Sequence, residues 1–168
     1  MSAGSGSKAK HPTTVERRSD TEVVVTRTIN GPARLVFEAF TKAELFQRWW
    51  VPKSLGMKLL SCEIDARVGG KYRLVFDFKP EPMAFFGTYT EVEPHTRLAW
   101  TNEEGGAEGP VTTVTFEERA GTTLLVLVER HPSKESLEAA GTGAQEALGE
   151  TFDQLEALLA GMGGGTGR

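Results

Sequence analysis

Three charged residues with the potential for chemistry surround a double-glycine turn near the middle of the sequence. Asp65 and Arg67 precede the turn at residues 69–70, and Arg73 follows it. Carboxylate and guanidinium groups so close together can form ion pairs, and we interpret Asp65 and Arg67 as the groups that hold this turn. Arg73 alternates with Tyr72 on a predicted strand, so the two side chains lie on opposite faces of the sheet. If the Arg73 face is the concave one, its guanidinium is a candidate anchor for a ligand carboxylate.

Few other residues have the type and spacing that catalysis or metal binding requires. Glu91 lies on a predicted strand and can serve as a general base only if it is buried with a raised pKa. His11, His95 and His131 fall in a tail, a turn and a loop and have no metal-ligand spacing. Cys62 is the only cysteine, which excludes an intrachain disulfide and a cysteine-based metal site. We therefore predict no catalytic residue, no metal and no cofactor, and we favour a binding protein over an enzyme.

The composition narrows the classes of partner. The 168 residues carry a formal net charge of −4, whereas a nucleic-acid-binding protein normally presents a basic face. No apolar run approaches the length of roughly 20 residues that a membrane-spanning helix needs, and residues 1–19 lack the apolar centre of a signal peptide. We therefore expect a cytoplasmic protein, monomeric or homodimeric, without a nucleic-acid partner or a membrane span.

Runs rich in Val and Thr, separated by Gly and Pro, predict a domain built mainly from short strands. Residues 1–20 have almost nothing to bury and predict a disordered tail, residues 21–160 predict a single domain, and residues 161–168 predict a flexible Gly-rich tail. Pro32 opens the first of two short helices, which end before Pro52. The predicted strands cover residues 22–29, 57–65, 71–78, 83–92, 97–102, 111–117 and 122–129.

The strongest periodic signal is a long amphipathic helix over residues 142–160. Leu148, Phe152, Leu155 and Leu159 recur at three- and four-residue spacing and form a stripe that can be buried against a sheet. Sequential strands joined by short turns form an antiparallel sheet, and a sheet of about seven strands must twist and curl. We therefore predict an α+β fold in which a curved antiparallel sheet surrounds a long C-terminal helix, together with two short helices. A single helix cannot fill such a sheet, so we expect a cavity between them.

Short motifs in a fixed order are similar to those of a known family. The motifs are Pro32 followed by Val36 and Phe37; Trp49, Trp50 and Pro52; Asp65, Arg67, Gly69, Gly70 and Arg73; Gly87, Val92, Pro94 and Leu98; and Val114, Thr115 and Phe116 before the C-terminal helix. Through them, residues 23–160 resemble the START-like (SRPBCC) superfamily with its birch-pollen-allergen-like, helix-grip fold. Within it they resemble the AHSA-type family, the homologues of the activator of the heat-shock-chaperone ATPase. Val51 and Leu148 depart from this pattern, because many relatives have Gly and Trp there.

The resemblance implies a deep, mostly apolar pocket between the sheet and the long helix. We expect this pocket to bind a small hydrophobic or amphipathic ligand that is lipid-like or aromatic. Two alternatives remain open, a cyclase or hydrolase on the same scaffold and a co-chaperone-like protein-interaction module. Each candidate side chain can also be an ordinary core residue, and we expect Trp49 and Trp50 to be core residues that anchor the short helix. The candidate ligand-binding residues are Phe37, Phe40, Trp50, Tyr72, Arg73, Phe85, Tyr89, Trp100, Leu148 and Phe152.

Overall fold

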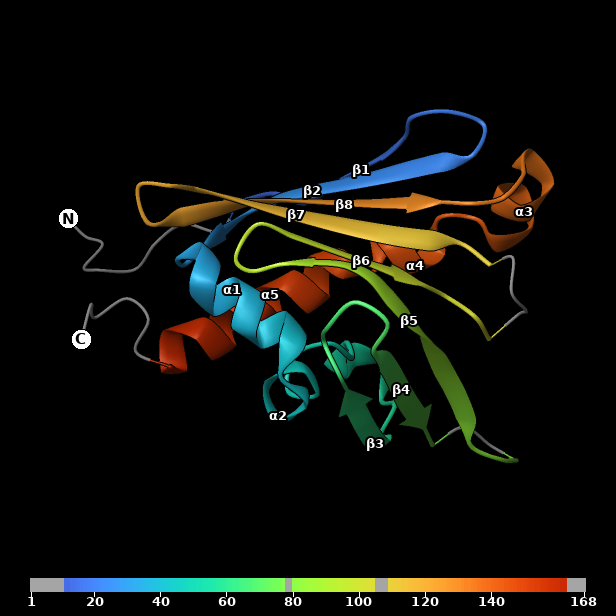
Figure 1. Cartoon of the computed structure of the whole chain (residues 1–168), viewed down its shortest axis with the longest axis horizontal. Coiled ribbons are helices and arrows are strands. Elements are labelled where there is room, and N and C mark those ends of the chain that lie inside the picture. The colour runs from blue at the N-terminus through green and yellow to red at the C-terminus, as the bar shows by residue number, and fades with distance from the viewer. Residues whose placement is uncertain (1–10, 78–79, 105–108, 163–168) are drawn as a thin grey trace.

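A curved antiparallel sheet of eight strands surrounds the helices (Figure 1). The computed structural model describes residues 11–77, 80–104 and 109–162, so residues 1–10 and 163–168 of the predicted tails lie outside the described part. The strand order across the sheet is β1-β2-β8-β7-β6-β5-β4-β3. This arrangement confirms the predicted α+β fold. The strands are β1 (Thr14–Arg17), β2 (Glu22–Asn30), β3 (Leu59–Ile64), β4 (Lys71–Phe76), β5 (Met83–Glu93), β6 (Arg97–Thr101), β7 (Val111–Arg119) and β8 (Thr122–Arg130).

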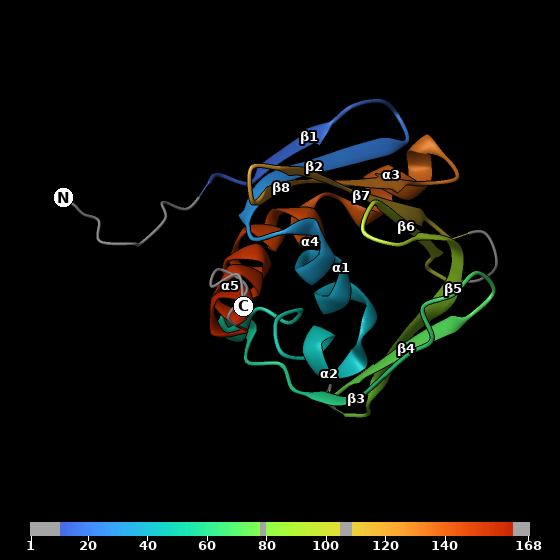
Figure 2. The ribbon, with the colours of Figure 1, turned by 60° about the vertical axis from the view of Figure 1, so that its left-hand side comes forward.

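The helices occupy the inside and the open side of the curl. Figure 2 shows α1 and α2 inside the curved sheet and α5 along its open side. α1 begins directly after Pro32, whose fixed φ suits the entry of a helix, and its Phe40 side chain packs edge-on against Phe116 of β7. The helical elements are α1 (Ala33–Thr41), α2 (Ala43–Phe46), the 3₁₀ helix η1 (Lys53–Leu55), α3 (Lys134–Ala140), α4 (Gly143–Glu146) and α5 (Leu148–Gly161).

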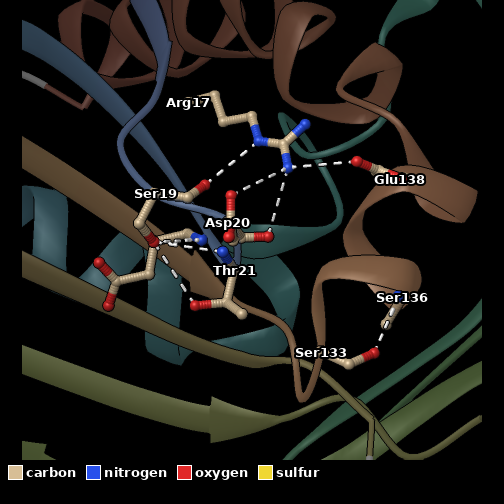
Figure 3. Close-up of polar contacts among 8 residues, drawn as sticks. Arg17, Ser19, Asp20, Thr21, Ser133, Ser136 and Glu138 are labelled. Carbon is tan, nitrogen blue, oxygen red and sulfur yellow. Dashed lines mark hydrogen bonds and ion pairs between the residues drawn. The ribbon is translucent and has the colours of Figure 1, made fainter.

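β1 corrects the prediction that residues 1–20 form a disordered tail. This four-residue strand pairs antiparallel with β2 at the edge of the sheet. The Arg17 guanidinium donates to the carbonyl oxygen of Ser19 at 3.2 Å and lies 3.7 Å from the carboxylate of Glu138 in α3 (Figure 3). The segment has few apolar residues of its own, and it is ordered because β2 offers its backbone groups as partners.

The predicted helix over residues 142–160 is interrupted near its start. Ala147 separates α4 from α5. Gly143 and Gly149 flank the interruption, and glycine is a poor helix former. The buried Gln145 side chain donates a hydrogen bond to a carboxylate of β8, so α4 is held against the sheet. α5 alone therefore runs along the open side of the curl.

β5 bends where it leaves β4 and joins β6. Gly87 pairs with Tyr72 of β4, and a Cβ at Gly87 would lie 1.8 Å from the carbonyl oxygen of Thr101. A register shift follows between Tyr89 and Glu91, where β5 carries one extra residue opposite β6. The close approach at Gly87 and the neighbouring bulge together bend β5 between the two parts of the sheet.

The bulge places Glu91 on the opposite face of the sheet from Tyr89, contrary to the alternation of the sequence. Tyr89 pairs with Trp100 of β6, whereas Glu91 pairs with Ala99. Adjacent residues of a strand face opposite sides, so one extra residue reverses the orientation of all that follow. The Glu91 carboxylate instead pairs with Arg97 at the partly exposed surface. Glu91 is therefore not placed to act as a base in the interior.

Candidate functional site

A cavity of about 390 Å³ lies between the concave face of the sheet and the helices. Its walls are mostly apolar and come from strands β3 to β6, from α1 and α2, from the segment after α2 and from the start of α5. Cavities of about 300–1,000 Å³ with apolar walls and a few polar groups hold small molecules in many proteins. Leu55 and Glu104 of the lining are exposed, so the lining reaches solvent.

Most of the candidate residues from the sequence line this cavity. They come from six separate segments and meet because the sheet curls around the helices. Their role in ligand binding stays a prediction, whereas their position around a single cavity is an observation of the structure. The lining includes Phe40, Trp50, Tyr72, Phe85, Tyr89, Trp100 and Leu148.

Phe37 and Phe152 are core residues rather than part of the lining. Phe37 is buried and packs edge-on against Phe116 and His95, with ring centroids 5.7 Å and 5.6 Å away. Phe152 is completely buried, and its ring centroid lies 6.4 Å from that of Trp49. Both point into the packed part of the interior, which periodicity alone does not separate from the cavity.

Arg73 is exposed on the outer face of β4, so it is not an anchor for a ligand inside the cavity. Its neighbours Tyr72 and Leu74 face inward and line the cavity. The ion pair expected before the double-glycine turn is present, because the Arg67 Nε donates to the Asp65 carboxylate at 2.9 Å.

The paired tryptophans have different roles. Trp49 is completely buried, and its indole Nε1 donates to the carbonyl oxygen of Ala39 at 2.9 Å, which confirms it as a core anchor. Trp50 is partly buried, stacks on Phe46 with ring centroids 4.8 Å apart and lines the cavity.

α5 fixes the segment between Trp49 and η1 above the cavity. The Gln154 amide donates to the carbonyl oxygens of Trp49 at 2.9 Å and Val51 at 2.8 Å. Its carbonyl oxygen accepts from the Lys53 backbone N–H at 2.8 Å. The Glu150 carboxylate accepts from the Ser54 hydroxyl and backbone N–H, and these hydrogen bonds lower the pKa of Glu150. This wall of the cavity is therefore held by side chains of a single helix.

A buried ion pair attaches the same helix to the sheet. Arg27 faces inward from β2, and only 2% of its side chain is exposed. Its guanidinium donates to Asp153 at 2.8 Å and Glu156 at 3.1 Å on α5, and to the Thr13 hydroxyl at 2.8 Å. Because a buried guanidinium requires charged or polar partners, this cluster sets the position of α5.

One row of side chains crosses the concave face from β8 to β5. Glu129 pairs with Thr112, Thr112 with Trp100, and Trp100 with Tyr89. Directly paired residues share a face, so a carboxyl group of β8 lies at one end of a row that continues into the aromatic wall. The polar part of the lining also includes Asn102, Glu104 and Thr151, and sequence reasoning missed these three residues as well as Glu129.

The carboxyl group of Glu129 is largely buried beside two polar groups of the C-terminal region. Its Oε1 accepts a hydrogen bond from the Gln145 Nε2 and lies 3.6 Å from the His131 Nε2. Burial raises the pKa of Glu129, the neighbouring His131 lowers it, and the carboxylate of Glu104 raises it further. Chemically, this group can accept hydrogen bonds, pair with a cation or exchange a proton.

The phenol groups of the lining stay protonated at ordinary pH. The Tyr72 hydroxyl donates to the carbonyl oxygen of Thr101 at 3.0 Å and to the Asn102 Oδ1 at 3.2 Å. Burial is the main cause that raises the pKa of Tyr72, and Glu104 adds to it. Burial likewise raises the pKa of Tyr89.

The sequence from residue 30 to residue 160 matches the family described as Activator of Hsp90 ATPase homolog 1-like protein. The chain belongs to this family. The Activator of Hsp90 ATPase homolog 1-like match covers β3 to β8, α1, α2 and nearly all of α5, and therefore every element that lines the cavity. It confirms the resemblance to the START-like superfamily and its helix-grip fold.

Solved structures support this fold at low sequence identity. A protein from Rhodobacter sphaeroides has a TM-score of 0.78 at 20% identity, over 89% of this chain and 99% of its own. A protein from Nitrosomonas europaea has a TM-score of 0.76 at 22% identity, over 87% and 98%. An AHSA1-like protein from Aeromonas hydrophila has a TM-score of 0.63 at 22% identity, over 83% and 94%. The comparison with curated proteins found no match.

In residues 11–77, 80–104 and 109–162, no helix has the length and apolar character needed to cross a membrane. Within the same residues, no three His, Cys, Asp or Glu side chains are grouped so that they could hold a metal ion.

Proposed function

We propose that this protein binds a small hydrophobic or amphipathic molecule in the cavity between the sheet and α5. The observation that carries the proposal is the cavity itself, which has about 390 Å³ of space and mainly aromatic and aliphatic walls. A ligand with an apolar body would remove these walls from water, and the few polar groups would orient it. The lining aromatic rings can pack against an aromatic or lipid-like body.

A substitution that fills the cavity tests this function. Leu148 lies in the lining at the first residue of α5, and we expect Leu148→Trp to occupy the space with its indole ring. Leu60→Trp is the matched control, because Leu60 is half exposed and adds the same bulk outside the lining. Native mass spectrometry of each protein with a panel of aromatic and lipid-like molecules measures the bound fraction.

The expected result is at least about a tenfold loss of affinity in Leu148→Trp and none in Leu60→Trp, because filling a pocket removes the space for the ligand's apolar contacts. Circular dichroism confirms that both variants keep the sheet. Equal binding by wild type and Leu148→Trp would place the site outside the cavity and reject the proposal. Failure of the whole panel to bind the wild-type protein would reject it as well.

The second candidate is a cyclase or hydrolase activity on the same scaffold, and Glu129 is the observation that favours it. A carboxyl group that reaches a cavity and has a raised pKa can act as a general acid. Chemical conversion of a bound molecule by the wild-type protein, detected as a mass change and abolished in Glu129→Gln, would establish this activity. Release of every ligand unchanged by the wild-type protein would favour simple binding.

A further inference from the structure

The charged groups that line the cavity are all acidic. Within the described part of the chain, the lining contains the carboxyl groups of Glu104 and Glu129 and no Lys, Arg or His. His131, 3.6 Å from Glu129, is a neighbour of the carboxyl group rather than a member of the lining. A ligand carboxylate or phosphate would therefore enter a space with two carboxyl groups of its own sign and no cation in the walls.

Two neutral polar side chains of the lining, Asn102 and Tyr72, have already used their donors. The Asn102 Nδ2 donates to the carbonyl oxygen of Pro110 and to the Thr112 hydroxyl, both at 3.0 Å. The Tyr72 hydroxyl donates to Thr101 and Asn102. Thus Asn102 and Tyr72 can offer a ligand only acceptor lone pairs. The Tyr89 hydroxyl, which also lines the cavity, can donate or accept.

One oxygen of Glu129 has no partner in the part of the chain that the structure describes. Its contacts with Gln145 and His131 both involve Oε1. Among the described residues, neither a hydrogen bond nor an ion pair involves Oε2, although the residue lines the cavity. Next to it, the Gln145 Oε1 is buried without a hydrogen-bond partner in the described structure. A buried carboxylate with an open acceptor position is stabilised by a donor, and most by a cationic one.

The aromatic wall lies on the same cross-strand row as Glu129. Trp100 and Tyr89 follow Glu129 and Thr112 across the sheet, and Tyr72 packs edge-on against both rings, with centroids 6.4 Å and 5.9 Å away. Aromatic faces attract cations and also bury the apolar body of a ligand. One end of the cavity therefore suits a positive group, and the rest suits hydrocarbon.

We propose that the preferred ligand of this cavity is an apolar molecule that carries a protonated amine, with the amine bound by Glu129 and Glu104 and the apolar body packed against Tyr72, Tyr89 and Trp100. This inference rests on the proposed binding function and specifies the class of its ligand. The amine supplies donors to the open acceptor positions of Glu129 and Glu104, and its charge compensates the carboxylates. An apolar acid of the same shape is rejected.

Three naphthalene derivatives of closely similar size test the inference by isothermal titration calorimetry at neutral pH. 2-(2-Naphthyl)ethylamine is cationic, 2-(2-naphthyl)ethanol is neutral and 2-naphthylacetate is anionic. We expect the amine to bind at least about tenfold more tightly than the alcohol, because a charged hydrogen bond in a partly buried site adds this much. The acetate is expected to bind more weakly than the alcohol.

Variants then locate the selectivity. Glu129→Gln keeps the shape and the hydrogen-bonding capacity of the side chain, and it is expected to remove most of the preference for the amine while the affinity for the alcohol stays within about twofold. Glu104→Gln, at an exposed position of the lining, is expected to reduce the preference to a smaller extent. Glu91→Gln is the matched control, since it removes the same charge on the outer face.

The outcomes separate the inference from the function on which it rests. If the alcohol binds but the amine is no tighter, or the acetate is the tightest, the ligand class is wrong and the binding function stands. If Glu91→Gln lowers the preference as much as Glu129→Gln, the effect is one of net charge and the inference is overturned. If none of the three probes binds and the wider panel also fails, both proposals fall. If Glu129→Gln does not fold, Glu104→Gln is the deciding variant. An unchanged preference for the amine over the alcohol in Glu104→Gln would then overturn the assignment of the amine site.

Discussion

Gly87→Ala is expected to destabilise the fold because another backbone occupies the space that a side chain would need. A Cβ at this position would lie 1.8 Å from the carbonyl oxygen of Thr101 and 2.8 Å from the Tyr72 Cε2. The first distance is about 1.6 Å shorter than the 3.4 Å at which ordinary van der Waals contact begins. Neither neighbour is the far end of a flexible chain, so β5 must move away from β6 or Tyr72 must leave its place.

The cost follows from what such a movement breaks. Overpacking a core site costs about 1–3 kcal/mol. The displacement also strains two hydrogen bonds of Thr101, one from the Tyr72 hydroxyl at 3.0 Å and one from the Thr88 N–H at 3.0 Å, each worth about 1 kcal/mol. Replacing glycine stiffens the unfolded chain and returns about 0.4–1 kcal/mol. We therefore expect a net loss of about 2–4 kcal/mol, or roughly 5–15 °C in Tm for a domain of this size.

Urea unfolding followed by circular dichroism measures this loss. Gly149→Ala is the matched control, because its Cβ would find only Thr13, 3.9 Å away, and alanine is the better helix former in α5. The same substitution is thus expected to stabilise the protein by up to about 1 kcal/mol at one position and to destabilise it at the other. A Gly87→Ala protein within about 0.5 kcal/mol of wild type would refute the close approach as a rigid constraint.

Further predictions concern groups whose titration or charge the fold controls. Tyr72 and Tyr89 are the only tyrosines, and burial raises the pKa of each, so absorbance at 295 nm should show no tyrosinate near pH 10 until the protein unfolds; a normal titration near pH 10 in the folded state contradicts this. Burial raises the folded pKa of Glu129 above its unfolded value, so the folded state binds the proton more tightly, and stability should fall as the pH rises from the ordinary carboxyl range of about 4 through the raised pKa of this group. Glu129→Gln should remove this fall in Tm, and an unchanged pH profile would count against the reasoning. Burial, with Glu63 adding to it, raises the pKa of Cys62 to about 11. A disulfide reagent at pH 8 should therefore react with Cys62 about a hundredfold more slowly than with a free thiol, and equal rates would show an accessible thiolate. Arg27→Ala leaves two carboxylates of α5 without their buried partner and should cost about 3–5 kcal/mol in urea unfolding; a loss below about 1 kcal/mol would mean that the cluster does not hold the helix.

The order of elements and the aromatic lining could be predicted because local patterns determine them. Pro32 and Pro52 delimit the two short helices, and alternating residues such as Tyr72 and Leu74 indicate a strand with one inward face. What the alternation cannot give is which face is inward. For this reason the sequence assigns Arg73 to the cavity only conditionally, and the structure places it on the outer face.

Glu129 could not be found because both faces of its strand are apolar. Leu125 and Leu127 face the interior in phase with Glu129, but Leu124 and Val126 present an equally apolar pattern on the other face. No periodicity argument selects one phase over the other. The assignment depends on the register with β7, which brings Glu129 opposite Thr112 and into the row of Trp100.

Other residues were misplaced or missed because distant parts of the chain decide their environment. The bulge beyond Tyr89 reverses the phase of β5 and turns Glu91 outward, and a single extra residue leaves no compositional signal. Arg27 is an inward-facing charge whose partners, Asp153 and Glu156, lie 126 and 129 residues away. Such pairing is a tertiary property and can be recognised only when the fold is known.

The positions of the tryptophans have a practical consequence for studying this protein. Of the three in the chain, Trp50 and Trp100 line the cavity, whereas Trp49 is completely buried outside the lining and donates a hydrogen bond to the backbone. Indole fluorescence responds to the polarity of its surroundings. A ligand that displaces water from the cavity should therefore shift the emission wavelength of Trp50 and Trp100, while Trp49 supplies a constant background. The molecule therefore contains an intrinsic optical reporter of occupancy, and unmodified protein is sufficient to screen for what it holds.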